Sequence, residues 1–135
     1  MILPLLDDGR VVLIRNNRFA VGGDLLELPA GTIDNNEPPV ECARRELAEE
    51  TGYRASKFEP LLAFHSTPGI CNELLHVFVA TGLTLGETAR EPGERIENTP
   101  MEYEGALRAI GDGRITDGKT IVALLYHDRF VRGSR

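Results

Sequence analysis

The most constraining feature of this sequence is an acidic face on a helix predicted over residues 39–51. Prolines at the start favour helix initiation, and the glycine that follows, Gly52, is suited to ending the helix. At 3.6 residues per turn, Glu46 and Glu50 lie one above the other, with Glu49 beside them. Apolar residues at helical spacing form a separate stripe for burial: Val40, Ala43 and Leu47. The pattern predicts a helix with one buried face and one acidic face.

This acidic face breaks two local rules of helix stability. Glu49 and Glu50 lie in the last turn, where the helix dipole disfavours acids by about 0.3–1 kcal/mol each. The like charges of Glu46 and Glu50, four residues apart, cost about 0.2–0.5 kcal/mol more. A solvated charged helix is the ordinary explanation for such a pattern. However, uncompensated breaks of local rules often mark functional sites, and a hard cation such as Mg²⁺ or Mn²⁺ would supply the compensation.

The helix belongs to a longer pattern, Gly-x5-Glu-x7-Arg-Glu-aliphatic-x-Glu-Glu-x-Gly-apolar. The matching residues are Gly31, Glu37, Arg45, Glu46, Leu47, Glu49, Glu50, Gly52 and Tyr53. In this pattern the chain resembles the signature box of the Nudix hydrolases, which cleave nucleoside diphosphates linked to another moiety. The resemblance implies an α/β (α+β) fold, the family's α/β/α sandwich, with a mixed β-sheet and a loop–helix–loop catalytic motif. We expect one such domain over residues 1–135.

The resemblance also assigns roles within the box. It implies that Glu46 and Glu50 are direct ligands of Mg²⁺, with Mn²⁺ as an alternative, and that the main-chain carbonyl of Ala30 completes a metal shell. Glu49 is expected to act in catalysis, as a ligand or as an anchor for metal-bound water. Glu37 and Arg45 are expected to support this geometry through an ion pair. Gly31 and Gly52 are expected to support it as well.

Substrate choice is predicted from residues outside the box. The run Arg15-Asn16-Asn17-Arg18, followed by Glu27-Leu28-Pro29-Ala30-Gly31, looks like the ADP-ribose pyrophosphatase branch. That branch has an Arg-Gln-Tyr-Arg-like run before Glu-Leu-Pro-Ala-Gly, so the two asparagines depart from it. By this resemblance Arg18 contacts a phosphate, although an exposed loop arginine is the alternative. Pro68 occupies the place of the proline that marks the branch and is a candidate substrate-binding residue.

A late acidic loop supplies a further metal ligand or the general base in this branch. Here Glu94 is the expected residue, both as ligand and as catalytic base, with Glu91 and Glu97 as alternatives. Such a site suits phosphoric anhydrides, because water must attack phosphorus against negative charge. Divalent ions neutralise that charge and lower the pKa of the water, and a nearby carboxylate accepts its proton.

Composition restricts the partners of the chain. The formal net charge of −6 argues against a general nucleic-acid-binding role, which needs a basic face. The two cysteines have no metal-binding or redox spacing, so we expect free thiols. No leader or membrane-spanning run is visible, which predicts a cytoplasmic protein.

Branch members commonly swap N-terminal strands within a dimer, but this chain starts nearly at its first core strand. The expected homodimer would therefore form through another face.

The order of elements follows from turn signals and apolar periodicity. We expect a hairpin of strands 2–6 and 10–15 around Asp7-Asp8-Gly9, and a polar loop over residues 16–24. The remaining expected elements are strand 25–28, loop 30–39, strands 57–64 and 73–81, and a charged loop over 86–99 with a short strand near 95–98. Helices are expected at 101–110 and 118–129, the latter capped by Thr116 or Asp117.

Three functions remain as hypotheses at this point. The leading one is Mg²⁺-dependent hydrolysis of the pyrophosphate bond of ADP-ribose or a related nucleoside diphosphate sugar, giving a nucleoside monophosphate and a sugar phosphate. A nucleoside triphosphate pyrophosphohydrolase, which shares the same box, would release pyrophosphate instead. A nucleotide sensor without catalysis typically loses box glutamates, and here all four are present.

Overall fold

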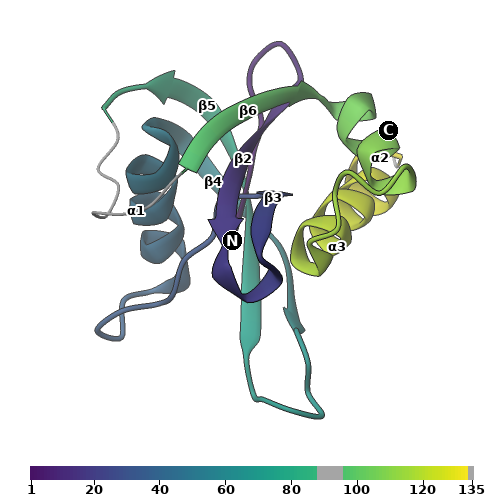
Figure 1. Ribbon diagram of the computed structural model, residues 1–135. Coiled ribbons are helices and arrows are strands. Elements are labelled where there is room, and N and C mark those ends of the chain that lie inside the picture. Colours follow the sequence, from purple (N-terminus) through teal and green to yellow (C-terminus); the bar gives the residue numbers. More distant parts are fainter. Residues whose placement is uncertain (88–95, 134–135) are drawn as a thin grey trace.

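Two small β-sheets lie between one helix on one side and two helices on the other (Figure 1). The structure is a computed structural model and describes residues 1–87 and 96–133. Its elements in chain order are β1 (Ile2–Pro4), β2 (Arg10–Arg18), the 3₁₀ turn η1 (Phe19–Val21), β3 (Gly23–Glu27), α1 (Pro39–Thr51), β4 (Tyr53–His65), β5 (Leu74–Leu85), β6 (Ile96–Glu102), α2 (Tyr103–Gly111), α3 (Gly118–His127) and the π-helical segment η2 (Asp128–Arg132).

The two sheets differ in their strand pairing. The first has the order β1-β5-β4, with β1 parallel to β5 and β4 antiparallel to it. The second has the order β3-β2-β6 and is antiparallel throughout. With α1 on one side and α2 and α3 on the other, the predicted α+β class and helix–sheet–helix layering are confirmed. The mixed sheet is one of two sheets rather than the whole β layer.

Side chains of the first sheet alternate between two hydrophobic cores, as the period of two in a β-strand requires. One core packs under α1 and contains Ile2, Ala43, Leu47, Phe78 and Ala80. The larger core packs under α2 and α3, and its members from the first sheet are Leu3, Val77 and Val79. The stripe predicted on α1 is therefore buried, which leaves its acidic face toward the loop that precedes the helix.

The predicted polar loop over residues 16–24 is wrong. β2 continues to Arg18, η1 reverses the chain, and β3 begins at Gly23. Gly22, with φ of 71°, permits the reversal, and the Asn17 amide donates to Asp24 Oδ1 across the hairpin at 2.8 Å. Cross-strand pairing of polar side chains thus outweighs their low strand propensity.

The predicted turn at Asp7-Asp8-Gly9 is present, since the Leu6 N–H donates to the Arg10 carbonyl at 2.9 Å and Leu5 forms an antiparallel bridge with Val11. The predicted pairing does not extend further, because β1 pairs in parallel with β5 instead. Late in the chain, β6 reaches Glu102, so a strand occupies the start of the segment predicted as helix. In α3, Asp117 is the capping residue, because its carboxylate accepts the Thr120 N–H.

Two further predictions concern the cysteines and the membrane. Cys42 is buried and Cys71 is exposed, and both are free thiols, as predicted. Burial raises the pKa of Cys42 to about 11. Among the described residues, no helix has the length and apolar character needed to cross a membrane.

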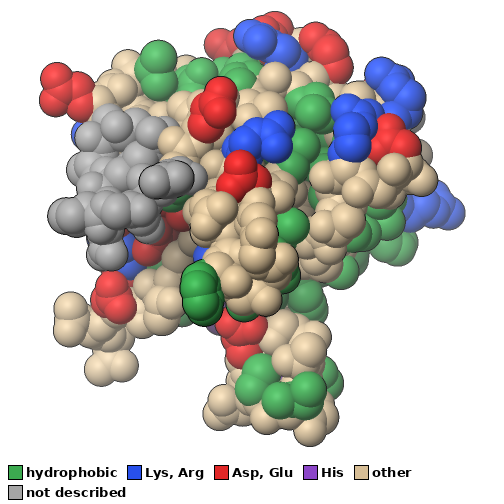
Figure 2. Space-filling view, viewed as in Figure 1, with side chains coloured by type: hydrophobic (Ala, Val, Ile, Leu, Met, Phe, Trp, Pro, Cys, Tyr) green, Lys and Arg blue, Asp and Glu red, His purple; other side chains and the backbone are tan. Residues whose placement is uncertain are grey.

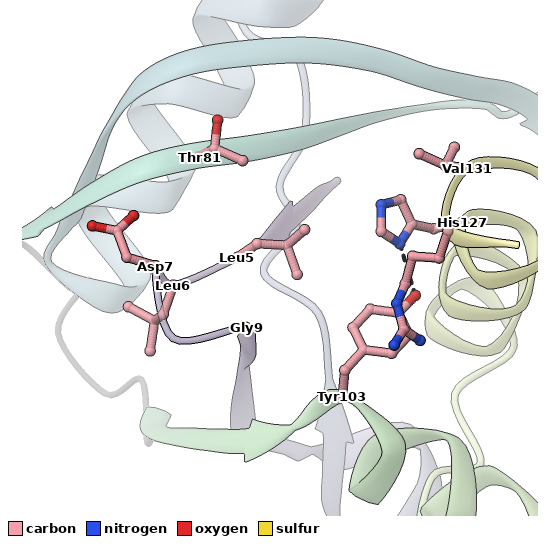
Figure 3. A pocket seen from close by; sticks show the side chains of 9 residues that line it. Leu5, Leu6, Asp7, Gly9, Thr81, Tyr103, His127 and Val131 are labelled. Carbon is pink, nitrogen blue, oxygen red and sulfur yellow. Dashed lines mark hydrogen bonds between the residues drawn. The ribbon is translucent and has the colours of Figure 1, made fainter. Parts of the chain in front are cut away.

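A buried tyrosine joins α2 to α3 (Figure 3). The Tyr103 hydroxyl donates to the Leu124 carbonyl at 3.0 Å, so its oxygen must accept the 2.9 Å hydrogen bond from His127 Nδ1. Burial raises the pKa of Tyr103, and the Arg132 guanidinium lies 4.0 Å from the centre of its ring. A cavity of about 490 Å³, with Leu5 and Leu6 in its lining, opens beside this group.

This geometry predicts a stability effect for Tyr103→Phe. Removing the hydroxyl takes away two buried hydrogen bonds, so the free energy of unfolding should fall by about 1–3 kcal/mol. Urea denaturation measures the change. The control is Tyr126→Phe, at a tyrosine that is 37% exposed, where we expect a change of less than about 0.5 kcal/mol. Equal effects in the two variants would contradict the role given to the Tyr103 hydroxyl.

Candidate active site

Helix α1 carries the predicted acidic face, and its limits follow from local sequence. Pro39 is its first residue, where the missing N–H costs nothing. Gly52 ends it in the left-handed conformation, with φ of 77° and its N–H bonded to the Ala48 carbonyl. Ala43 and Leu47 are buried beneath the helix. Glu46, Glu49 and Glu50 therefore project from a rigid element, as a site that must hold its geometry requires.

Arg45 holds the acidic face together. Its Nη1 donates to Glu46 Oε1 at 2.7 Å and to Glu49 Oε2 at 3.0 Å. Its Nη2 donates to Glu37 Oε1 at 2.7 Å and to the Thr32 carbonyl at 3.1 Å. The hydrogen bond with Glu37 is the main cause that raises the pKa of Arg45, and the same bond lowers the pKa of Glu37. One guanidinium thus links the preceding loop to two of the three helix carboxylates.

Glu50 is held differently from the other two. It is only 6% exposed, and its Oε2 accepts the Ala30 N–H at 3.0 Å. The neighbouring Gly31 lies against Glu46, since a Cβ at this glycine would collide with the Glu46 carboxylate. A glycine is needed here for close approach rather than for an unusual φ. The loop residues Ala30 and Gly31 therefore lie directly against the carboxylates of Glu50 and Glu46.

These groups line a polar cavity of about 240 Å³. Its lining consists of Asn16, Arg18, Ala30, Gly31, Thr32, Asp34, Arg45, Glu46, Glu49 and Glu50. Oxygen donors of this kind fit a hard divalent cation. Within residues 1–87 and 96–133, however, no group of three or more His, Cys, Asp or Glu side chains is already arranged to hold a metal ion. A cation would have to compete with Arg45 for Glu46 and Glu49. The predicted Glu94 and its alternative Glu91 lie outside the described residues.

A second cavity, of about 690 Å³, adjoins the first and shares Arg18, Ala30, Gly31 and Thr32 with it. Its further lining comes from the start of α3, the end of β4, the β4–β5 loop and the start of β5: Phe64, His65, Ser66, Thr67, Glu73, Leu75, Asp117, Gly118, Lys119 and Val122. The acidic cavity therefore opens onto a larger chamber with cationic side chains, which suits an extended anionic molecule.

Two cations converge at this chamber around a buried carboxylate. Glu27 has no exposed surface, and it accepts two hydrogen bonds from Arg18 at 2.8 and 2.7 Å and one from Lys119 at 3.0 Å. Lys119 also donates to Asp117 at 2.8 Å. The hydrogen bond to Glu27 is the leading cause that raises the pKa of Arg18. The pairing holds both cations in place, and their exposed parts line the chamber.

The predicted substrate residues lie at different places in this arrangement. Arg18 lines both cavities. Pro68 is exposed in the β4–β5 loop, and the neighbouring Ser66 and Thr67 line the larger chamber instead. This loop projects at the lower edge of Figure 2, with apolar side chains at its tip. Ile70, which belongs to the loop, is 90% exposed.

Sequence reasoning missed Lys119 and the buried state of Glu27. Lys119 is 92 residues from Glu27 along the chain, and no local pattern signals a contact at that distance. The one available signal was the predicted cap at Asp117, which fixes where α3 begins.

The chain matches the NUDIX domain over residues 1–121, and it belongs to the Nudix family of hydrolases. It is 35% identical over 127 residues to the ADP-ribose pyrophosphatase of Bacillus subtilis (strain 168). The aligned region covers 93% of this chain and 69% of that protein. It is 39% identical over 127 residues to the GDP-mannose pyrophosphatase of Yersinia pestis (strain Pestoides F), covering 87% of this chain and 64% of the relative. The chain thus spans about two thirds of the length of these relatives.

A solved structure described as an ADP compounds hydrolase has a similar fold. The TM-score is 0.89 at 24% sequence identity, over 99% of this chain and 72% of that one. The helix–sheet–helix layering described above is therefore shared with a solved structure, as the sequence resemblance implied.

Gly31→Ala should separate metal binding from folding. The new methyl group displaces the Glu46 carboxylate, which is the flexible end of a side chain, so the melting temperature should change little. Binding of Mn²⁺, followed by the electron paramagnetic resonance signal of the free ion, should weaken by about 10-fold or more. The control is Gly111→Ala, since a Cβ at that position meets nothing within 4 Å. Unchanged Mn²⁺ affinity in Gly31→Ala would argue against a site at Glu46.

Proposed function

We propose that this protein hydrolyses the pyrophosphate bond of ADP-ribose or a related nucleoside diphosphate sugar, with Mg²⁺ as the preferred cofactor. The products are a nucleoside monophosphate and a sugar phosphate. One observation carries the proposal: an oxygen-lined cavity with three glutamates opens onto a larger chamber that contains Arg18 and Lys119. The names of the two relatives, which refer to ADP-ribose and GDP-mannose, support the same class of substrate.

The residues of the acidic cavity would hold the metal. We assign Glu46, Glu49, Glu50 and the Ala30 carbonyl as its ligands, with Glu94 as a further ligand. A bound divalent cation supplies neutralisation of the phosphate charge and a lower pKa for the attacking water. We assign Glu49 as the group that accepts the proton of that water, a role supported by its side chain being 40% exposed and the most accessible of the three. Glu94 is the alternative base.

The larger chamber would bind the rest of the substrate. Arg18 and Lys119 would donate to phosphate oxygens, because each side chain lines the chamber and stays partly exposed while paired with Glu27. Their side chains are 41% and 21% exposed, respectively. Water attack on phosphorus then breaks the bond to the bridging oxygen, and the two phosphate-bearing products leave separately. Polar groups on the β4–β5 loop, such as Ser66 and Thr67, are available to the sugar hydroxyls. Pro68 stays a candidate contact on this loop.

Two wider expectations belong to the same proposal. A homodimer through a face other than swapped N-terminal strands is supported by apolar side chains exposed on the last helical segments, such as Leu125 at 48% and Phe130 at 60%. A cytoplasmic location is supported by the two free cysteines.

A product assay tests the proposal. ADP-ribose, GDP-mannose, other nucleotide sugars and nucleoside triphosphates are incubated with Mg²⁺, and the products are identified by mass spectrometry. We expect a nucleoside monophosphate and a sugar phosphate. Glu50→Gln should lower turnover by about 100-fold or more, because it removes a ligand charge but keeps the side-chain shape.

The matched control for that assay is Glu41→Gln. This glutamate lies on the same helix, is exposed and pairs with Arg44, so turnover should be unchanged. Release of pyrophosphate from triphosphates alone would favour the triphosphate pyrophosphohydrolase. Tight binding of ADP-ribose without any product would favour a nucleotide sensor.

Lys119→Met should act on substrate binding rather than on metal binding. Removing one of two cations should raise KM by about 10-fold, with a smaller change in kcat, because a charge-assisted hydrogen bond is worth about 1.5–3 kcal/mol. The control, Lys57→Met, changes an exposed lysine that pairs with Glu59. If KM is unaltered in Lys119→Met, the larger chamber does not bind the substrate phosphates.

A further inference from the structure

The last turn of α1 ends inside the molecule, where its carbonyl groups need partners. Thr51, the last residue of the helix, has no exposed surface. The final carbonyls of a helix have no donor within the helix. Here the Asn98 side chain of β6 donates from Nδ2 to the Thr51 carbonyl at 2.8 Å, and the Gly86 N–H donates to the Gly52 carbonyl at 2.8 Å. The Asn98 contact therefore fixes the backbone immediately after Glu50.

Asn98 is an unusual residue at this position. It lies within a β-strand, where asparagine is disfavoured, and it pairs with the buried Ile14 of β2. Its Oδ1 is buried and accepts no hydrogen bond within the part of the chain that the structure describes. Rotating the amide by 180° would place this oxygen against the Thr51 carbonyl, so the hydrogen bond determines the orientation. The strand tolerates an unsatisfied polar atom in order to keep this donor.

The position of Asn98 connects it to the acidic cavity from two sides. Ile96, its neighbour on the same face of β6, pairs with Asn16, which lines that cavity. Glu50 precedes Thr51 directly, and its carboxylate accepts the Ala30 N–H. Glu50 is therefore held at its carboxylate by the loop and at its backbone by β6, through Asn98.

We propose that Asn98 is a positioning residue for the carboxylates of Glu49 and Glu50, acting through the Thr51 carbonyl, an inference that rests on the metal site of the proposed function. Without the donor, the last turn of α1 loses its tie to β6, and the two carboxylates no longer share one fixed geometry. Carboxylates that are not already held in the binding geometry lose conformational entropy when a cation binds. The affinity for the cation therefore falls.

The experiment measures Mn²⁺ binding by electron paramagnetic resonance, which does not depend on turnover. In Asn98→Leu, the donor is lost while the branched shape of the side chain is kept, and we expect the dissociation constant for Mn²⁺ to rise by about 10-fold, as for loss of a group that orients a metal ligand. The Mg²⁺ concentration for half-maximal turnover should rise in parallel. The substrate KM at saturating Mg²⁺ should stay as in the wild type.

The matched control is Thr99→Val, one residue along the same strand. Thr99 pairs with Leu13, and its hydroxyl makes a long contact of 3.5 Å with the Glu97 carbonyl. This variant should bind Mn²⁺ as the wild type does. If Asn98→Leu does not fold, Asn98→Ala removes the same donor without adding bulk.

The outcomes separate the possibilities. Wild-type Mn²⁺ affinity in a folded Asn98 variant with a lowered melting temperature would show a merely structural role and overturn the proposal. Equal weakening in Thr99→Val, or no Mn²⁺ binding by the wild type, would also overturn it. Weakened Mn²⁺ binding in the Asn98 variants alone supports it. If that result appears in a protein that cleaves none of the nucleotide substrates, the positioning role stands and the proposed reaction fails.

Discussion

The acidic site depends on one guanidinium group. Three glutamates near the negative end of a helix repel one another and the helix dipole, at a cost of roughly 1–2 kcal/mol from the terms given above. Arg45 offsets this by donating to two of those glutamates and to Glu37. Its Nη1 joins the carboxylates of Glu46 and Glu49 through one shared donor group. A divalent cation and Arg45 would share the same oxygens, so metal affinity depends on how readily this arginine yields Glu46 and Glu49.

The larger chamber also contains a carboxylate paired with cations. At the acidic face the arginine holds the carboxylates in place, whereas in the chamber the carboxylate holds the cations in place. Glu27 is fully buried, and a buried carboxylate is tolerated only when it is paired and hydrogen-bonded. Arg18 and Lys119 provide that pairing, and Glu27 in turn fixes the directions of both cations. A flexible surface arginine would lose side-chain entropy on binding a phosphate. A cation already fixed by a buried partner loses much less, so the pairing prepares the chamber for an anion.

Much of the site could be predicted from the sequence, because its signals are local. The helix was predicted over residues 39–51 and is observed over Pro39–Thr51, since proline, periodicity and a terminal glycine all act within a few residues. The ends of β2 and β3 were missed because polar side chains pair across the hairpin, which composition does not reveal. The contact of Lys119 with Glu27, and the parallel pairing of β1 with β5, join distant segments. Such contacts depend on how the layers pack, and a single sequence carries no direct signal for them.

The shortest strand of the first sheet has a consequence for how the protein unfolds. Ile2 and its neighbour Leu3 belong to different hydrophobic cores, one beneath α1 and the other beneath α2 and α3. Extracting β1 would open both cores in a single event, so the two layers cannot melt independently. Helix α1 therefore shares one cooperative unit with the helices on the far side of the sheets, and its rigidity derives from the entire molecule.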